Sequence, residues 1–192
     1  MNMQTKRCAN ERGLGRVCKG LAAGLIGGLV ASWTMNRFQD GWSKLAQGNR
    51  ISPPGQDQLQ SRQLESDEQG SVEPEDDTTV KTASAISEAV FDHKLTQREK
   101  KIAGPAVHYA LGTSVGGLYG AVAEVAPKVT TGAGLPFGAA FWLVVDEGAV
   151  PILGLSKGPT QYPLSTHVYA LASHFVYGLT TELVRRVVLK AL

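Results

Sequence analysis

Apolar and polar residues are strongly segregated along this chain of 192 residues. Four windows are dominated by Gly, Ala, Leu and Val, at residues 20–36, 102–126, 132–155 and 164–188. A helix that crosses a bilayer needs about 20 mostly apolar residues. None of the last three windows shows the repeating polar face that a helix in a soluble core requires. The pattern therefore predicts an all-α, polytopic membrane protein, a bundle of four glycine-rich transmembrane helices.

The polar residues gather in two stretches beside the first window. Residues 1–19 form a basic N-terminal segment, and residues 37–81 form a long linker with a Pro53-Pro54-Gly55 run and an acidic cluster at 73–77. Low hydrophobicity combined with high charge cannot offset the entropy lost on ordering, so we expect most of this linker to be disordered. The sequence leaves open whether the acidic insert is a plain spacer or binds a partner.

Regular structure is expected to resume near residue 82 and to continue to residue 192. Residues 83–95 are weakly amphipathic and predict a short helix before the second window. Thr96 and Glu99 then have the spacing of a capping box, in which each side chain satisfies a free amide of the other. This box would begin a helix that continues into the second window, with a bend at Pro105 that membrane helices tolerate.

The first window could be a cleaved signal peptide, because Arg16 and Lys19 precede a short apolar run that ends in Val-Ala-Ser. The unusually long basic region, which contains Glu11, favours a retained helix instead. Basic residues precede the first window and close the last, which predicts that both termini are cytoplasmic. Arg98, Lys100 and Lys101 argue for the opposite orientation of the second window, so the side on which the long loop lies stays open.

Composition and motifs exclude several classes of function. The net charge of +2 and the lack of a recognisable motif argue against binding of nucleic acid. No nucleophile elbow, phosphate-cradling loop or metal-protease helix is visible, so we predict neither an enzyme nor a bound cofactor or metal. Cys8 and Cys18 do not form a metal-binding pair and are expected to be reduced thiols.

Glycines recur at steps of four in three of the windows. Small residues at this spacing let helix backbones approach closely, so these positions predict helix packing, either within one chain or in a homo-oligomer. The predicted packing residues are Gly20, Gly24 and Gly28, then Gly112, Gly116 and Gly120, and finally Gly134 and Gly138.

Ionisable residues lie inside the apolar windows, where each charge costs at least about 2.5–3.5 kcal/mol on insertion scales. One predicted layer in the outer half of the bundle contains His108, Asp146, Glu147, His167 and His174. Glu124 and Glu182 form a second acidic layer near the opposite surface. The first layer suits structural hydrogen bonding, a proton relay or cation binding. We expect Asp146 to face the bundle and pair with His108 or His174, because a step of four places it on the ridge of Gly134, Gly138 and Trp142.

The run from Trp142 through Asp146, Glu147 and Pro151 to Ser156, followed by Pro159, resembles the YagU-like family of bacterial inner-membrane proteins. Similar runs are His108-Tyr109, Gly117 to Gly120 and His174 to Gly178. The resemblance covers residues from about 102 to the C-terminus and the first window, and it leaves out the polar linker. It implies a bacterial inner-membrane location and no established reaction.

Together these features predict a multi-pass protein of the bacterial inner membrane that is not an enzyme. Its helical bundle would associate with the lipid bilayer, form a homo-oligomer or support the envelope. The alternative is a small transporter or a proton- or ion-conducting protein that uses the Asp/Glu–His layer. The sequence names no substrate or ion for that alternative.

Overall fold

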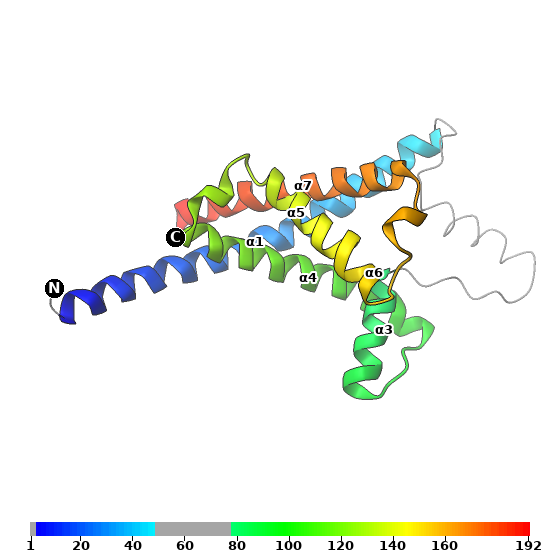
Figure 1. Ribbon diagram of the computed structural model, residues 1–192, viewed down its shortest axis with the longest axis horizontal. Coiled ribbons are helices and arrows are strands. Elements are labelled where there is room, and N and C mark those ends of the chain that lie inside the picture. Colours follow the sequence, from blue (N-terminus) through cyan, green and yellow to red (C-terminus); the bar gives the residue numbers. More distant parts are fainter. Residues whose placement is uncertain (1–2, 49–77) are drawn as a thin grey trace, which may run out of the picture. The chain divides into compact units, whose positions relative to one another are not determined.

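A computed structural model describes residues 3–48 and 78–192, and all regular structure in these ranges is helical (Figure 1). The Pro-Pro-Gly run, the acidic cluster and the rest of residues 49–77 lie outside the described residues. The elements are α1 (Met3–Gly48), α3 (Thr78–Phe91), α4 (Gln97–Val125), η1 (Pro127–Thr130), α5 (Leu135–Val144), the π-helical turn η2 (Val145–Ala149), α6 (Val150–Ile152), η3 (Pro159–Gln161) and α7 (Leu164–Ala191).

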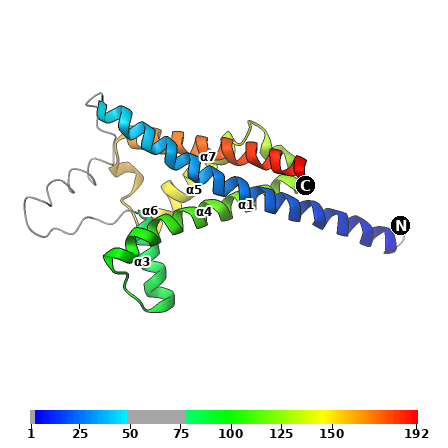
Figure 2. The same ribbon diagram turned by 180° about the vertical axis from the view of Figure 1, so that it is seen from behind.

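The described chain forms two compact units, and helices α1, α4, α5 and α7 each contribute to both. The first unit takes residues up to 35, residues 109–140 and residues 174–192. The second takes residues 36–108 and 141–173. Within the first unit, α4 and α7 lie beside α1, and α5 lies beside α7 (Figures 1 and 2). The all-helical class predicted from the sequence is confirmed for the described residues.

Helix α1 is much longer than the predicted window of residues 20–36. It is continuous over Met3–Gly48, so the described basic segment is helical, and so are residues 37–48 of the predicted linker. Local polar contacts support this extension, because Arg37 pairs with Asp40 at 3.1 Å and the Ser43 hydroxyl donates to the Gln39 carbonyl. The prediction of a disordered linker was therefore wrong for its first twelve residues, and also for residues 78–81, which begin α3.

The capping box at the start of α4 is confirmed. The Thr96 backbone amide donates to the Glu99 carboxylate at 2.7 Å, and the Glu99 amide donates back to the Thr96 hydroxyl at 3.4 Å. The first of these bonds, with a bond from the Thr96 hydroxyl, holds the pKa of the Glu99 carboxyl below its usual range. The preceding helix α3 ends at Phe91, before the predicted end at residue 95. Asp92 follows directly and takes a positive φ of 50°.

The third predicted window begins as a turn. Gly132, Ala133 and Gly134 have positive φ angles of 76°, 55° and 87°, so the helix starts only at Leu135. Gly134 was thus wrongly assigned to a helical ridge, because a left-handed backbone ends regular α geometry. At the other end, Gly154 has a φ of 71° and its amide donates to the Pro151 carbonyl, which closes α6 earlier than residue 155.

Close contact between glycines fixes the packing of α1 against α4 in the first unit. A Cβ added at Gly24 would lie 2.9 Å from the Gly120 Cα, and one added at Gly116 would lie 2.6 Å from the Gly28 Cα. Gly20 similarly meets the Gly120 carbonyl, so residue numbers rise along α1 as they fall along α4. The two predicted ridges therefore face one another within one chain as an antiparallel pair.

A second close approach joins α5 to α7. A Cβ added at Gly178 would lie 3.0 Å from the Gly138 Cα, and one at Gly134 would lie 3.0 Å from the Glu182 Cβ. Helix α7 also approaches α1, since a Cβ at Gly27 would lie 2.7 Å from the Thr181 carbonyl oxygen. Backbones at such distances leave no room for large side chains between the helices.

Two helical stretches of the described chain are long and apolar enough to cross a membrane. They are Gly13–Leu45, with a mean hydropathy of 1.4, and Leu135–Ile152, with a mean hydropathy of 1.3. The helices over the predicted windows 102–126 and 164–188 are also long, at 29 and 28 residues. Their glycines, hydroxyl groups, histidines and charges lower their mean hydropathy, so length and composition alone do not mark them as spans.

Candidate functional site

The interior of the first unit is built from small and polar residues. Ser32, His174, Thr181 and Glu182 are buried there, each no more than 5% exposed. None of the described Leu, Ile, Val or Phe side chains is buried. Short hydroxyl side chains satisfy themselves locally, as when Thr181 donates to the Tyr177 carbonyl one turn earlier at 2.8 Å. The large polar groups need partners from other helices.

Glu182 of α7 is the centre of a buried ion network in this unit. Its carboxylate accepts hydrogen bonds from the Tyr119 hydroxyl at 2.9 Å, from Arg185 at 2.8 and 3.1 Å, and from Arg186 at 2.6 Å. The carboxylate is 1% exposed, so these four bonds replace water almost completely. A carboxylate in such a position stays ionised only if it is paired, and two guanidinium groups provide the pairing.

Arg185 links Glu182 to the second acid of this layer. Its guanidinium lies 3.0 Å from the Glu124 carboxylate at the end of α4, and it also lies over the Tyr119 ring at 5.9 Å. The structure thus brings together Glu124 and Glu182, the two acids that the sequence placed in one layer. Sequence reasoning missed Arg185, Arg186 and Tyr119. The spacing of the arginines, three and four residues after Glu182, was the signal that could have found them.

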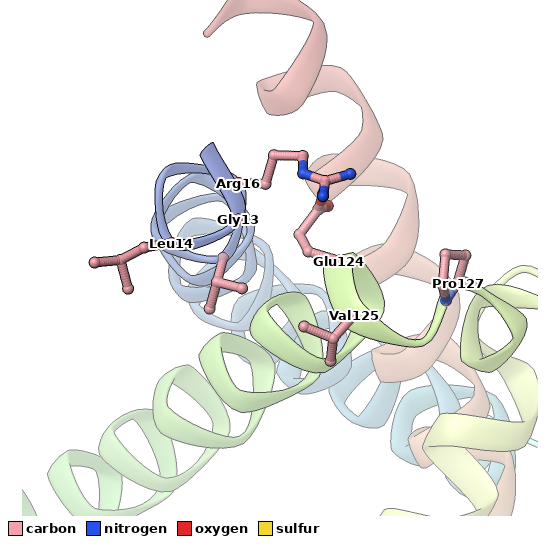
Figure 3. A pocket seen from close by; sticks show the side chains of 7 residues that line it. Gly13, Leu14, Arg16, Glu124, Val125 and Pro127 are labelled. Carbon is pink, nitrogen blue, oxygen red and sulfur yellow. The ribbon is translucent and has the colours of Figure 1, made fainter. Parts of the chain in front are cut away.

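A shallow hollow of about 660 Å³ opens beside this network (Figure 3). It is lined by residues 13–17 of α1, except Gly15, and by Glu124, Val125 and Pro127. The Arg16 side chain points toward Glu124 across the hollow. The lining is mainly apolar with one acid and one base, and the described residues contain no group of three or more His, Cys, Asp or Glu that could hold a metal ion.

The second unit contains a different polar pair, Glu147 and His167. The Nδ1 atom of His167 lies 2.7 Å from the Glu147 carboxylate, and its Nε2 atom lies 3.0 Å from the backbone carbonyl oxygen of Pro159. The two side chains are 16% and 21% exposed. The rings of Trp142 and Tyr162 meet the imidazole edge-on, with centroids 6.4 and 6.5 Å away. The histidine is therefore held on several sides by the turn, the connection and two aromatic rings.

The π-helical turn η2 decides which acid meets the histidine. A π turn holds one residue more than an α-helical turn, so residues within and after it do not keep the four-residue register. The register that placed Asp146 over Gly138 and Trp142 assumed an unbroken α-helix, and this assumption was wrong. Glu147 makes the contact with His167, while Asp146 and His108 take part in other interactions of the fold.

The predicted His/acid layer is distributed over both units. His108, Asp146, Glu147 and His167 belong to the second unit, and of these Glu147 and His167 are in direct contact. His174 is buried in the first unit, where its backbone carbonyl lies against Gly138. The arrangement offers one acid–histidine pair suited to holding a proton and a separate ion network suited to fixing helices.

Comparison with known proteins identifies the family without adding a reaction. No curated protein and no solved structure matches the chain significantly. The model of a family described as "protein of unknown function (DUF1440)" matches residues 67–183. This match covers more than half of the chain and includes α4, α5, η2 and most of α7, with Glu147, His167 and Glu182, and it ends before Arg185 and Arg186. The chain therefore belongs to the DUF1440 family.

Proposed function

We propose that this chain is a non-enzymatic integral protein of the bacterial inner membrane, a bundle of four transmembrane helices that supports the envelope alone or as a homo-oligomer. The spans would lie within α1, within α4 from about residue 102, from α5 to α6, and within α7. This proposal requires lipid as a partner, and the proposed role involves no nucleic acid, cofactor or metal.

The observation that carries the proposal is the inverted distribution of apolar residues. Small and polar residues fill the interior, while large aliphatic side chains face outward on every proposed span. Leu118 on α4, Leu143 on α5 and Leu183 on α7 are 63%, 58% and 60% exposed. Water penalises such exposure by about 25 cal/mol per Å² of apolar surface. A bilayer removes that penalty and favours close packing of small residues instead.

The two most apolar stretches support a lipid environment separately. A core helix of a soluble protein would be mostly buried, yet only 6% of Leu135–Ile152 is buried. The stretch Gly13–Leu45 is near the N-terminus, where a signal sequence would pass the same test of hydropathy. Its glycines pack against α4, however, and cleavage would remove one side of that contact. Retention of α1 is therefore part of the proposal.

The location and topology rest on other features. The resemblance to YagU-like proteins supports the bacterial inner membrane, and the basic residues near both ends of the chain support cytoplasmic termini. The glycine ridges Gly20–Gly28 and Gly112–Gly120 are used within one chain, so a homo-oligomer would form through a different surface.

Labelling of single cysteines in intact membranes tests the four spans. Cys8 and Cys18 are first replaced by serine, and Leu118→Cys, Leu143→Cys and Gln97→Cys are then made separately. Leu118 and Leu143 are exposed on the protein surface but would lie in lipid, so a polar maleimide should label them slowly. Gln97, exposed before the second span, should label at once after the membrane is permeabilised. Labelling of all three at one rate would rule out the proposed spans.

A second candidate function is a small transporter or a proton- or ion-conducting protein. The contact between Glu147 and His167 favours it, because this titratable pair lies in or beside proposed spans and joins two segments that are distant in sequence. Ion flux into proteoliposomes tests this candidate, with wild type compared against Glu147→Gln and Asp146→Asn. Flux that Glu147→Gln abolishes would support conduction, and absence of flux with protons or alkali cations would leave the scaffold role alone.

A further inference from the structure

We propose that Glu147 and His167 form a proton-binding site that fastens the π-helical turn η2 to the connection before α7. For the second candidate function, this proposal means that the ion bound by the Glu147–His167 pair is a proton. It rests on the contacts of His167 itself, so it can hold whether or not the protein conducts.

The argument begins with the hydrogen-bonding capacity of an imidazole. Neutral histidine has one N–H donor and one nitrogen lone pair, while the protonated ring has two donors and no acceptor. Both ring nitrogens of His167 face oxygen atoms that act as acceptors, a carboxylate at 2.7 Å and a backbone carbonyl at 3.0 Å. The carbonyl of Pro159 can never donate. A neutral ring beside an ionised Glu147 would therefore leave one nitrogen lone pair facing an oxygen.

One additional proton removes this conflict. With the proton on the ring, Nδ1–H donates to Glu147 and Nε2–H donates to Pro159, and the pair is formally neutral. The ring and the carboxylate then attract one another in a site that is about four-fifths shielded from solvent. When the proton leaves to water, the pair gains a net negative charge and loses one of its two hydrogen bonds.

The same geometry argues against a metal or alkali cation at this position. A cation needs a lone pair from the imidazole, and the protonated ring offers none. The two oxygen atoms that contact the ring are spaced to accept its two N–H groups. The site therefore selects a proton by the direction of its hydrogen bonds.

Each partner of His167 belongs to a segment that needs fastening. Glu147 is in the π turn, and Pro159 begins the short helix η3 of the connection. In that connection the Lys157 amide donates to the Tyr162 hydroxyl at 3.3 Å, and the Tyr162 amide donates to the Pro159 carbonyl at 3.3 Å. Loss of the Nε2–H bond would remove a side-chain hydrogen bond that ties this carbonyl to α7, so the connection should open more easily as the proton leaves.

Few titratable groups of the described residues lie on the π turn, on the connection before α7 or within one turn of His167 on α7. The π turn contributes Glu147 and Asp146, the connection contributes Lys157 and Tyr162, and α7 contributes Tyr169. Among these described groups, Glu147 forms the ion pair with His167, and Tyr162 meets it through its ring. The protonation of His167 therefore depends chiefly on one carboxylate.

Nitrogen NMR of the full chain in lipid nanodiscs, with ¹⁵N-labelled histidine, tests the proposal directly. The signal is assigned by its loss in His167→Gln. At pH 7.5 an ordinary histidine is about nine-tenths neutral. We expect both ring nitrogens of His167 to be protonated at that pH. A neutral His167 tautomer in wild type at pH 7.5 would overturn the proposal.

Glu147→Gln provides the matched variant. Its amide can donate to Nδ1 of a neutral ring while Nε2–H still donates to Pro159, so no additional proton is required. We expect His167 to be neutral at pH 7.5 in this variant. In wild type, hydrogen exchange of the Gln161 and Tyr162 amides, corrected for intrinsic rates, should accelerate at high pH as the proton leaves. In Glu147→Gln this acceleration should be absent. Equal acceleration in both proteins would contradict the fastening role. Absence of ion flux would exclude conduction and leave this result unaffected.

Discussion

The hydroxyl of Tyr177 donates to the backbone carbonyl oxygen of Gly112 across 2.6 Å, at a point where three helices meet. Tyr177 is 1% exposed, and a Cβ on Gly112 would lie 3.4 Å from its ring and 3.4 Å from the Ser32 Cβ. The glycine therefore gives the tyrosine of α7 and the serine of α1 access to the same place on α4. A polar side chain and a small residue together connect these helices where apolar burial contributes little.

Tyr177→Phe should lower the free energy of unfolding by about 1 kcal/mol, because interhelical hydrogen bonds in membrane proteins contribute about 0.6 and at most about 1.7 kcal/mol. The ring volume is nearly unchanged, so the loss reports the hydroxyl. Reversible unfolding in mixed micelles measures it. A variant as stable as wild type would show that the Gly112 carbonyl does not need this donor.

Gly116→Ala and Gly41→Ala should change stability in opposite directions. The new Cβ at Gly116 would lie 2.6 Å from the Gly28 Cα, so α1 and α4 must separate, at a cost of about 1–3 kcal/mol. Gly41 is also helical but has nothing within 4 Å of the added atom. Its replacement should raise stability by up to about 1 kcal/mol through helix propensity. Thermal unfolding in detergent compares the two, and equal shifts would mean that the ridge is only compositional.

Glu182→Gln should be the most damaging conservative change among the acids of the first unit. It removes the buried charge that compensates Arg185 and Arg186, and breaking a buried pair costs about 3–5 kcal/mol. Glu124→Gln should cost less, because Glu124 is 20% exposed and contacts Arg185 alone in this network. Unfolding of both variants under identical conditions tests the order. Glu124→Gln being the more damaging would contradict the central place of Glu182.

The start of α4 should loosen in acid. Hydrogen bonds from Thr96 lower the pKa of Glu99 in the folded protein, so their stabilisation is complete above the usual range of a glutamate. It is lost as pH falls through the lowered pKa, since the protonated carboxyl accepts these bonds poorly. The Thr96 amide shift, followed by NMR from pH 6 to acid, should report this step. Glu99→Gln keeps an acceptor without titrating, and the step should disappear there.

The features predicted well from the sequence depend on neighbours along the chain or on spacing along one helix. The capping box needs only Thr96 and Glu99, and the glycine ridges need only a regular α-helix over each window. The structure then pairs the ridges of α1 and α4, since close approach is what glycine at that spacing permits. Glu124 and Glu182 meet for a similar reason, because alternating helices place them at one depth.

The features that were missed depend on other parts of the fold. A π turn inserts one residue at a cost that only its tertiary contacts offset, so nothing before Val145 announces that Glu147 and not Asp146 will meet His167. The contact to Pro159 also depends on where the connection folds. The extension of α1 to Gly48 was missed for another reason, since polar composition argued for disorder although local pairs allow a helix.

The glycine contact between α1 and α4 is nearly repetitive, and this raises the question of what defines its alignment. Gly20, Gly24 and Gly28 meet Gly120, Gly116 and Gly112, with Ser32 following in the same row. If α1 slid along α4 by one helical turn, glycine would again meet glycine, and only one contact of the row would be lost. Such a row promotes contact but discriminates poorly between neighbouring registers. The choice must come from contacts that do not repeat, such as the 3.2 Å bond from Thr34 of α1 to Thr180 of α7, combined with the bond from Tyr177 of α7 to Gly112 of α4. In this bundle the abundant small residues provide adhesion, and a few hydroxyl groups determine the alignment.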